Sequence, residues 1–188
     1  RPNLYFEVRR PTQKLPLLTQ LVEERAGRSG IIYCATRANV EKVCDHLRQR
    51  GIPATRYHAG LSEAERRQNQ DDFQFDRAPV MVATNAFGMG IDKSNVSYVF
   101  HFNMPKSLEA YYQEAGRAGR DGEAAECILL FAQGDVATAE FFIHQSGDNN
   151  EALTPAELEE IQARDYQRLE AMVGYCKTSR CLRGHILD

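Results

Sequence analysis

The sequence predicts an α/β fold: a parallel β-sheet flanked by helices and followed by a small helical segment. Short apolar runs rich in β-branched and aromatic residues alternate with amphipathic stretches of helical spacing up to about residue 145. This strand–helix alternation favours a parallel sheet with helices on both faces. Beyond it, a polar stretch precedes a long helical pattern, which predicts the appended helical segment.

Each expected strand is an uninterrupted apolar run, as in a strand buried on both faces. The runs occupy residues 30–35, 55–58, 79–83, 96–102 and 126–131. Residues 14–26 and 40–50 carry apolar side chains at helical spacing, so each is expected to form an amphipathic helix. Gly51 is a suitable C-cap for the second of these helices.

Three further helices are marked by local signals at their starts. Ser62, with Glu65 three residues later, has the pattern of a capping box. The other two helices are expected from near Ser107 and after Gly134. Each follows an expected strand, as the connections of a parallel sheet require.

The composition changes to small and polar residues at 147–155, which predicts a linker. Residues 1–146 would then form one domain, and residues 156–188 the incomplete start of a second. Pro155 and the acidic residues after it favour a helix that runs to about Cys176, with a short helix from near Ser179. Because the sequence begins with Arg1 and not Met, we interpret it as a piece of a longer protein.

Charge and hydropathy exclude two simple interpretations. The formal charge is −3 and the isoelectric point about 6.0, so the chain lacks the strongly basic balance typical of many nucleic-acid-binding domains. Any phosphate contact must come from a few well-placed donors. No apolar run approaches the roughly 20 residues that span a membrane, and the N-terminus has no signal-peptide pattern, so no membrane partner is expected.

The segment QEAGRAGR, residues 113–120, carries the strongest functional signal. If it is helical, Gln113, Arg117 and Arg120 share one face, because they are spaced by four and three residues. The two glycines of the segment remove bulk beside them, so another surface can approach. The planar forks of two guanidinium groups suit a triphosphate. The alternative, a solvated surface helix, leaves two helical glycines unexplained, each costing about 1 kcal/mol.

A second segment, TNAFGMGID at residues 84–92, follows an expected strand. In open parallel sheets, ligands bind beyond the carboxyl ends of the strands. Gly90 and its companion glycine let a ligand approach the backbone. Thr84 and Asn85 offer short polar groups, and Asp92 is a candidate acceptor for a ribose hydroxyl. A turn without a ligand is the alternative.

Further polar residues follow other expected strands. They are Thr36, Arg37, His58, Ala59, Gly60 and Lys106. Thr36 is equally a candidate N-cap, a role compatible with phosphate binding at a helix start. For His58, a structural histidine is the favoured alternative. Together these groups would form a row of donors along one sheet edge, as a nucleic-acid backbone requires.

Two parts of a nucleotide site are absent from the sequence. It has no G-x-x-x-x-G-K-[ST] phosphate loop and no D-E-x-[HD] segment to hold magnesium. The chain therefore offers arginines for a triphosphate but no primary site for one, and half of an active site is missing.

The cysteines divide into two groups by context. Cys34, Cys44 and Cys127 lie in apolar or helical patterns, which indicate buried, reduced thiols of an intracellular protein. Cys176 and Cys181, together with a nearby histidine (His185), have the spacing of a partial metal site. We favour a packed thiol for Cys176.

In this order, GIIYCATR, YHAGL, VATNAFGMGID and PKSLEAYYQEAGRAGRDG resemble the second RecA-like domain of RecQ-family helicases, within helicase superfamily 2. The resemblance extends over nearly the whole chain. It implies a RecA-like fold and ATP-driven, 3′-to-5′ unwinding of duplex DNA. ATP and Mg²⁺ would lie between this domain and an N-terminal RecA-like domain of the same protein. A DEAD-box RNA helicase typically reads H-R-x-G-R-x-x-R in the last segment, which disfavours an RNA helicase.

The resemblance also implies roles for single residues. Arg120 would be the arginine finger, Arg117 a second phosphate contact, and Gln113 the residue that couples nucleotide state to movement. Gly90 and Asp92 would lie at the nucleotide. The single-stranded DNA track would be lined by Thr36, Arg37, His58, Ala59, Gly60, Thr84, Asn85 and Lys106.

At the C-terminus, Cys181 resembles the first ligand of the family's zinc-binding domain, whose other cysteines would lie beyond Asp188. ATP, Mg²⁺ and Zn²⁺ are thus expected in the full-length protein and not on this chain alone, which would lack ATPase activity. The resemblance implies a location at the bacterial nucleoid in the cytoplasm, or in a eukaryotic nucleus. The alternative function is a nucleic-acid-binding or partner-binding module without a motor partner, which the missing phosphate loop favours.

Overall fold

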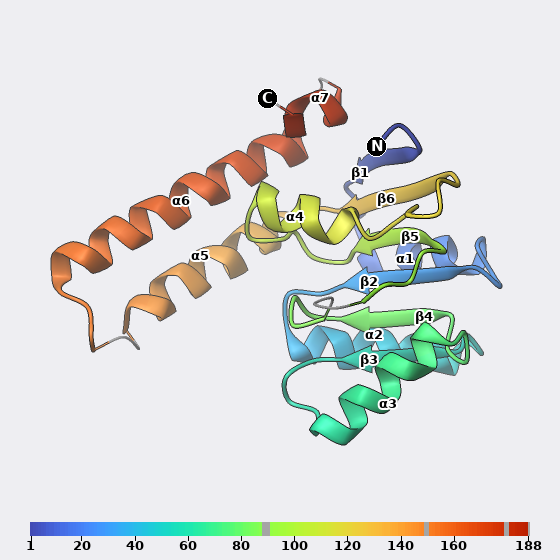
Figure 1. The fold of residues 1–188 in the computed structure, drawn as a ribbon. Coiled ribbons are helices and arrows are strands. Elements are labelled where there is room, and N and C mark those ends of the chain that lie inside the picture. The colour runs from blue at the N-terminus through green and yellow to red at the C-terminus, as the bar shows by residue number, and fades with distance from the viewer. Residues whose placement is uncertain (88–90, 149–150, 179–180, 188) are drawn as a thin grey trace.

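A computed structural model describes residues 1–87, 91–148, 151–178 and 181–187 (Figure 1). Its centre is a six-stranded parallel sheet with the order β1-β6-β5-β2-β4-β3. The strands are β1 (Leu4–Arg9), β2 (Ser29–Tyr33), β3 (Ala54–Tyr57), β4 (Val80–Ala83), β5 (Val96–His101) and β6 (Ala125–Leu130). The predicted α/β fold with a parallel sheet is confirmed.

Helices cover both faces of this sheet, as predicted. They are α1 (Lys14–Glu23), α2 (Arg37–Gln49), α3 (Glu63–Gln74), α4 (Leu108–Ala115), α5 (Gln133–Asp148), α6 (Pro155–Lys177) and α7 (Leu182–Leu187). One apolar cluster joins α1 and α2 to the face that carries Ile32 and Phe100. A second cluster joins α3, α4 and α6 to the face that carries Ile31 and Val99. Figure 1 shows α1 and α2 behind the sheet, with α3 and α4 in front.

The helix starts follow their sequence signals. Thr36, Ser62 and Ser107 each accept a hydrogen bond from a main-chain N–H three residues later and so cap α2, α3 and α4. At α3, the side chain of Glu65 binds Arg56, and the reciprocal capping box occurs instead at α6, between Thr154 and Glu157.

The helix ends differ slightly from prediction. α1 ends at Glu23, three residues earlier than expected. Gly51 follows the last turn of α2 with φ 78°, a left-handed conformation that suits glycine.

Strand β1 was not among the expected strands. It lies at an edge of the sheet and pairs only with β6, with Leu4 opposite Ala125. Leu4 is buried but Tyr5 is 57% exposed. The segment therefore lacks the uninterrupted burial by which the other strands were identified.

The C-terminal helices form an antiparallel pair, α5 and α6, that projects beyond the sheet (Figure 1). Helix α5 extends to Asp148 and α6 begins at Pro155, so the predicted linker at 147–155 overlaps the end of α5. The two-domain division stays a prediction. Ser179, the expected start of the last helix, lies outside the described residues, and α7 starts at Leu182. None of the helices in the described ranges is both long and apolar enough to span a membrane.

Candidate nucleotide and nucleic-acid sites

Only residues 113–115 of the arginine segment are helical, which corrects the first site prediction. Helix α4 ends at Ala115, and residues 116–121 form turns. Gly119 has φ 62°, and a Cβ at this position would lie 2.5 Å from Nδ2 of Asn3. Asn3 also donates to the Gly119 carbonyl at 2.7 Å. Gly119 thus serves a tight turn that packs on the N-terminal residues, and the shared helical face of Gln113, Arg117 and Arg120 does not exist.

The turn nevertheless brings Arg120 to the second predicted segment. Its Nη1 donates to the carbonyl of Ile91 at 3.0 Å. The next residue, Asp92, is exposed, whereas Gly90 lies outside the described residues. Arg120 and Gln113 also line a hollow of about 290 Å³ beside the start of the chain. The two segments that were expected to meet a nucleotide are therefore adjacent.

Arg117 takes a different environment from Arg120. Its side chain is half-buried and lies close to Tyr33, whose ring stacks on His101 with centroids 5.3 Å apart. Burial raises the pKa of Tyr33, and the positive charge of Arg117 opposes this rise. Arg120 is exposed. The two arginines thus have different surroundings: Arg120 faces solvent, whereas Arg117 packs against the sheet.

The predicted nucleic-acid residues all follow the carboxyl ends of strands. Thr36 and Arg37 follow β2, residues 58–60 follow β3, Thr84 and Asn85 follow β4, and Lys106 follows β5. Because these strands are neighbours and parallel, the residues share one edge of the sheet. The exposed members of the set are Arg37, Ala59, Gly60, Asn85 and Lys106.

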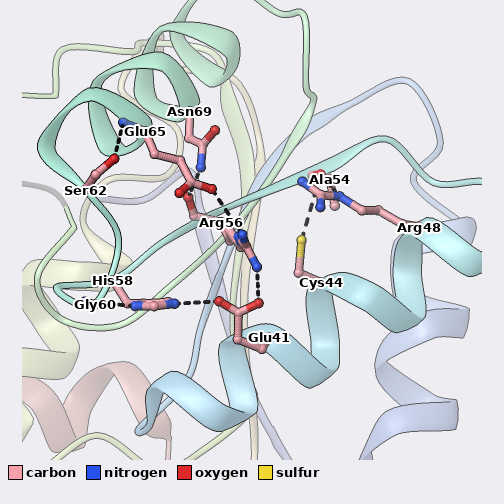
Figure 2. Close-up of polar contacts among 10 residues, drawn as sticks. All are labelled: Glu41, Cys44, Arg48, Ala54, Arg56, His58, Gly60, Ser62, Glu65 and Asn69. Atoms are coloured by element: carbon pink, nitrogen blue, oxygen red, sulfur yellow. Dashed lines mark hydrogen bonds and ion pairs between the residues drawn. The ribbon is translucent and has the colours of Figure 1, made fainter.

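His58 is a structural residue at this edge. It is 6% exposed, and its Nε2 lies 2.6 Å from Oε1 of Glu41 on α2 (Figure 2). Its Nδ1 accepts from the main-chain N–H of Gly60 at 3.0 Å. These contacts assign the neutral tautomer with the proton on Nε2, which donates to Glu41. Both ring nitrogens are used within the protein, so His58 positions residues 59–60 and does not itself offer a donor to phosphate.

Two polar residues of this edge were missed by the sequence reasoning. Glu41 also accepts from Arg56, and its position on α2 carried no signal. Asn103 accepts from the N–H of Ala35 at 2.8 Å and donates to Asp135 at 3.2 Å. Since Asn103 lies just after a predicted strand, the rule that selected Lys106 would have found it.

Comparison with known proteins decides the family. The sequence-family model of the helicase conserved C-terminal domain matches residues 13–122. The chain belongs to this family. A second family model, that of the RecQ zinc-binding family, matches residues 133–188 of the chain.

Several relatives of this helicase domain carry RecQ names. The ATP-dependent DNA helicase RecQ of Bacillus subtilis is 44% identical over 100% of the chain, which covers 30% of that protein. The RecQ of Haemophilus influenzae is 40% identical, and the RecQ-like DNA helicase BLM of Xenopus laevis 38% identical, again over the whole chain. The chain spans 29% and 14% of their lengths. The predicted resemblance is confirmed: the chain belongs to the helicase conserved C-terminal domain family and is similar to RecQ helicases along its whole length.

A solved structure supports the fold of the helicase domain. The C-terminal domain of the DEAD-box protein Dbp5 superimposes with a TM-score of 0.61 at 24% identity, covering 87% of this chain and 96% of that one. This likeness concerns the fold alone, and it confirms the RecA-like arrangement.

Among the described residues, no cysteine belongs to a cluster of potential metal ligands. Cys34, Cys44 and Cys127 are free and buried, as predicted. Cys176 is also buried, and burial raises its pKa to about 12, which disfavours the thiolate that zinc binds. Cys181 is exposed, and no group of three or more potential ligands occurs among the described residues. The zinc role of Cys181 stays a prediction.

Proposed function

We propose that this chain supplies one half of the ATP site and part of the single-stranded DNA track of an ATP-dependent 3′–5′ DNA helicase. The contact between Arg120 and the Ile91 carbonyl carries the first part of the proposal. It holds an exposed guanidinium beside the glycine-rich segment, with Gln113 lining the same hollow. The absence of a phosphate loop from the sequence means that the other half of the site comes from elsewhere.

In the full-length protein, ATP and Mg²⁺ would bind between this domain and an N-terminal RecA-like domain. Arg120 would act as the arginine finger, because its exposed guanidinium can reach a phosphate across the cleft and neutralise charge that develops during transfer. Gln113 would couple the nucleotide state to movement. Arg117 is the weaker candidate, since its half-buried side chain lies against Tyr33.

The DNA track would run along the carboxyl edge of the sheet. Arg37 and Lys106 are exposed cations at the ends of β2 and β5 and suit the phosphates of one strand. Ala59 and Gly60 are exposed and held in place by His58, so their backbone is accessible to DNA. Few cations take part, which agrees with the slightly acidic overall charge.

The test is DNA-stimulated ATP hydrolysis by the full-length protein. We expect Arg120→Ala to lower kcat by roughly 10³- to 10⁵-fold. Arg67→Ala, which removes a 74% exposed arginine on α3, is the control and should leave kcat unchanged. Retained turnover in Arg120→Ala would remove the arginine finger and favour a binding module. The isolated chain is expected to hydrolyse no ATP.

A further inference from the structure

The hollow beside Arg120 gathers two more arginines from distant parts of the chain. Arg1 comes from the start of the chain, Arg120 from the turn after α4, and Arg183 from α7. Gln113 and the rings of Tyr112 and Phe6 also line it, and among the described residues no acidic side chain does. Residues so far apart in sequence meet here only because β1 pairs with β6 and α7 packs on β1.

The three arginines are held in place by main-chain carbonyls. Arg1 donates to the carbonyl of Gly116, Arg183 to that of Leu4, and Arg120 to that of Ile91. Within the described parts of the chain, none of the three forms an ion pair with a carboxylate. A carbonyl orients a guanidinium without cancelling its charge, and each group has five N–H donors, most of which remain for a ligand.

Like charges that share one hollow repel one another, so their proximity costs free energy that a bound anion recovers. A guanidinium matches phosphate oxygens through its planar fork, which makes phosphate the fitting anion. The volume of about 290 Å³ suits a short polyphosphate and is too small for a duplex. Tyr112, 51% exposed, adds an aromatic surface at the same place.

We propose that Arg1 and Arg183 join Arg120 in binding the phosphates of the nucleotide. This inference rests on the proposed function, because Arg120 belongs to both. It adds two phosphate-binding residues, one of which lies on α7 within the region that matches the RecQ zinc-binding family. The nucleotide site would then extend beyond the helicase C-terminal match at 13–122 to both ends of the chain.

The experiment is an NMR titration of this chain with sodium tripolyphosphate at constant ionic strength, followed through the amide of Gly116 and the side-chain amide of Gln113. We expect saturable shifts at both groups. Arg183→Gln and Arg1→Gln should each weaken binding about tenfold, in line with the loss of a charge-assisted hydrogen bond. Arg183→Lys, which keeps the charge and loses the fork, should fall between. Arg67→Gln on α3 is the matched control and should bind as the original chain does.

The outcomes separate this inference from the proposed function. Absent or non-saturable shifts would overturn it, as would equal binding by Arg183→Gln and Arg67→Gln with native spectra in both. Shifts in the hollow with a thymidine oligonucleotide, but not with tripolyphosphate, would assign the site to DNA and overturn the nucleotide. In another outcome, full-length Arg120→Ala loses ATPase activity while the Arg1 and Arg183 variants bind tripolyphosphate unchanged. That result would support the arginine finger and overturn the role of Arg1 and Arg183. Weakened binding in the Arg1 and Arg183 variants, together with retained ATPase activity in full-length Arg120→Ala, would support the phosphate site and remove the arginine finger.

Discussion

At the scale of single residues, the exposed groups of the sheet edge depend on partners behind them. Glu41 is the central partner, since its carboxylate accepts from both His58 and Arg56 (Figure 2). Arg56 in turn reaches Glu65 at 3.0 Å, which ties α2 and α3 to the end of β3. Although burial raises the pKa of the Glu41 carboxyl, the hydrogen bonds from His58 and Arg56 outweigh it and lower the pKa overall.

Glu41→Gln should therefore destabilise the chain at neutral pH and not in acid. The amide keeps the size but loses the charge, so we expect a loss of about 1–2 kcal/mol in the free energy of unfolding at pH 7, reduced by partial solvent screening. Because the folded pKa lies below the ordinary value of 4.5, this contribution is present above pH 4.5 and is lost as the pH falls through the folded pKa. Urea unfolding at pH 7, 5 and 3.5 measures it.

The control for this prediction is Glu63→Gln. Glu63 is 80% exposed and pairs with Arg67 on the surface of α3, so its removal should change stability by less than about 0.5 kcal/mol. A Glu41→Gln deficit that stays constant down to pH 3.5 would show that the carboxylate charge is not its cause.

The sequence predicted which residues lie at this edge, and their roles stay predictions. Strand patterns placed Thr36, Thr84 and Lys106 correctly, because in a parallel sheet the position along the chain fixes the edge. Glu41 and Arg183 could not be predicted, since each acts through a partner far away in the sequence. No local pattern reports such contacts.

At the scale of elements, helix and strand assignments succeeded where burial was two-sided or a cap was present. The edge strand β1 was not predicted, because one of its faces is partly exposed. The helix predicted for the arginine segment was wrong beyond Ala115. Despite the helix-like spacing, the chain turns there, with Gly119 in a left-handed conformation packed on Asn3. Strand order was also beyond the sequence, although it decides that α7 and the arginine turn are neighbours.

A buried ion pair that joins elements far apart offers a prediction at this scale. Nζ of Lys14, the first residue of α1, lies 2.7 Å from Oδ2 of Asp135 on α5 and also donates to the Phe102 carbonyl at 2.6 Å. Both charged side chains are nearly buried, at 12% and 7% exposed. Asp135→Asn leaves the Lys14 charge buried without its partner, so we expect a loss of about 3–5 kcal/mol. Urea unfolding at pH 7 measures this.

The matched control is Glu23→Gln, which breaks the pair between Glu23 of α1 and Arg50 at the end of α2. These side chains are 42% and 56% exposed, so the loss should stay below about 1 kcal/mol. Equal losses in the two variants would contradict the importance of burial at Lys14–Asp135.

At the scale of the whole molecule, α6 is attached to the sheet by its C-terminal half. Leu169, Met172, Tyr175 and Cys176 are buried and belong to the same apolar cluster as strands β2, β4, β5 and β6. Tyr175 contacts Tyr111 of α4, with ring centroids 5.2 Å apart. The other half of α6 is largely exposed and packs on α5. The C-terminal region therefore shares its core with the sheet although it matches a separate family model.

This shared core predicts that the chain unfolds as one cooperative unit. Met172 is fully buried in the cluster, so Met172→Ala should cost about 2–5 kcal/mol and lower the melting temperature of the sheet and of α6 together, by roughly 5–15 °C. Far-UV circular dichroism and tyrosine fluorescence should give coincident transitions before and after the substitution. Glu170→Ala, at an exposed position of the same helix, should leave the transition in place. Loss of a side chain from a shared core destabilises all the elements that contribute to that core. If α6 instead melted first while the sheet kept its original transition, residues 156–188 would behave as a separate domain.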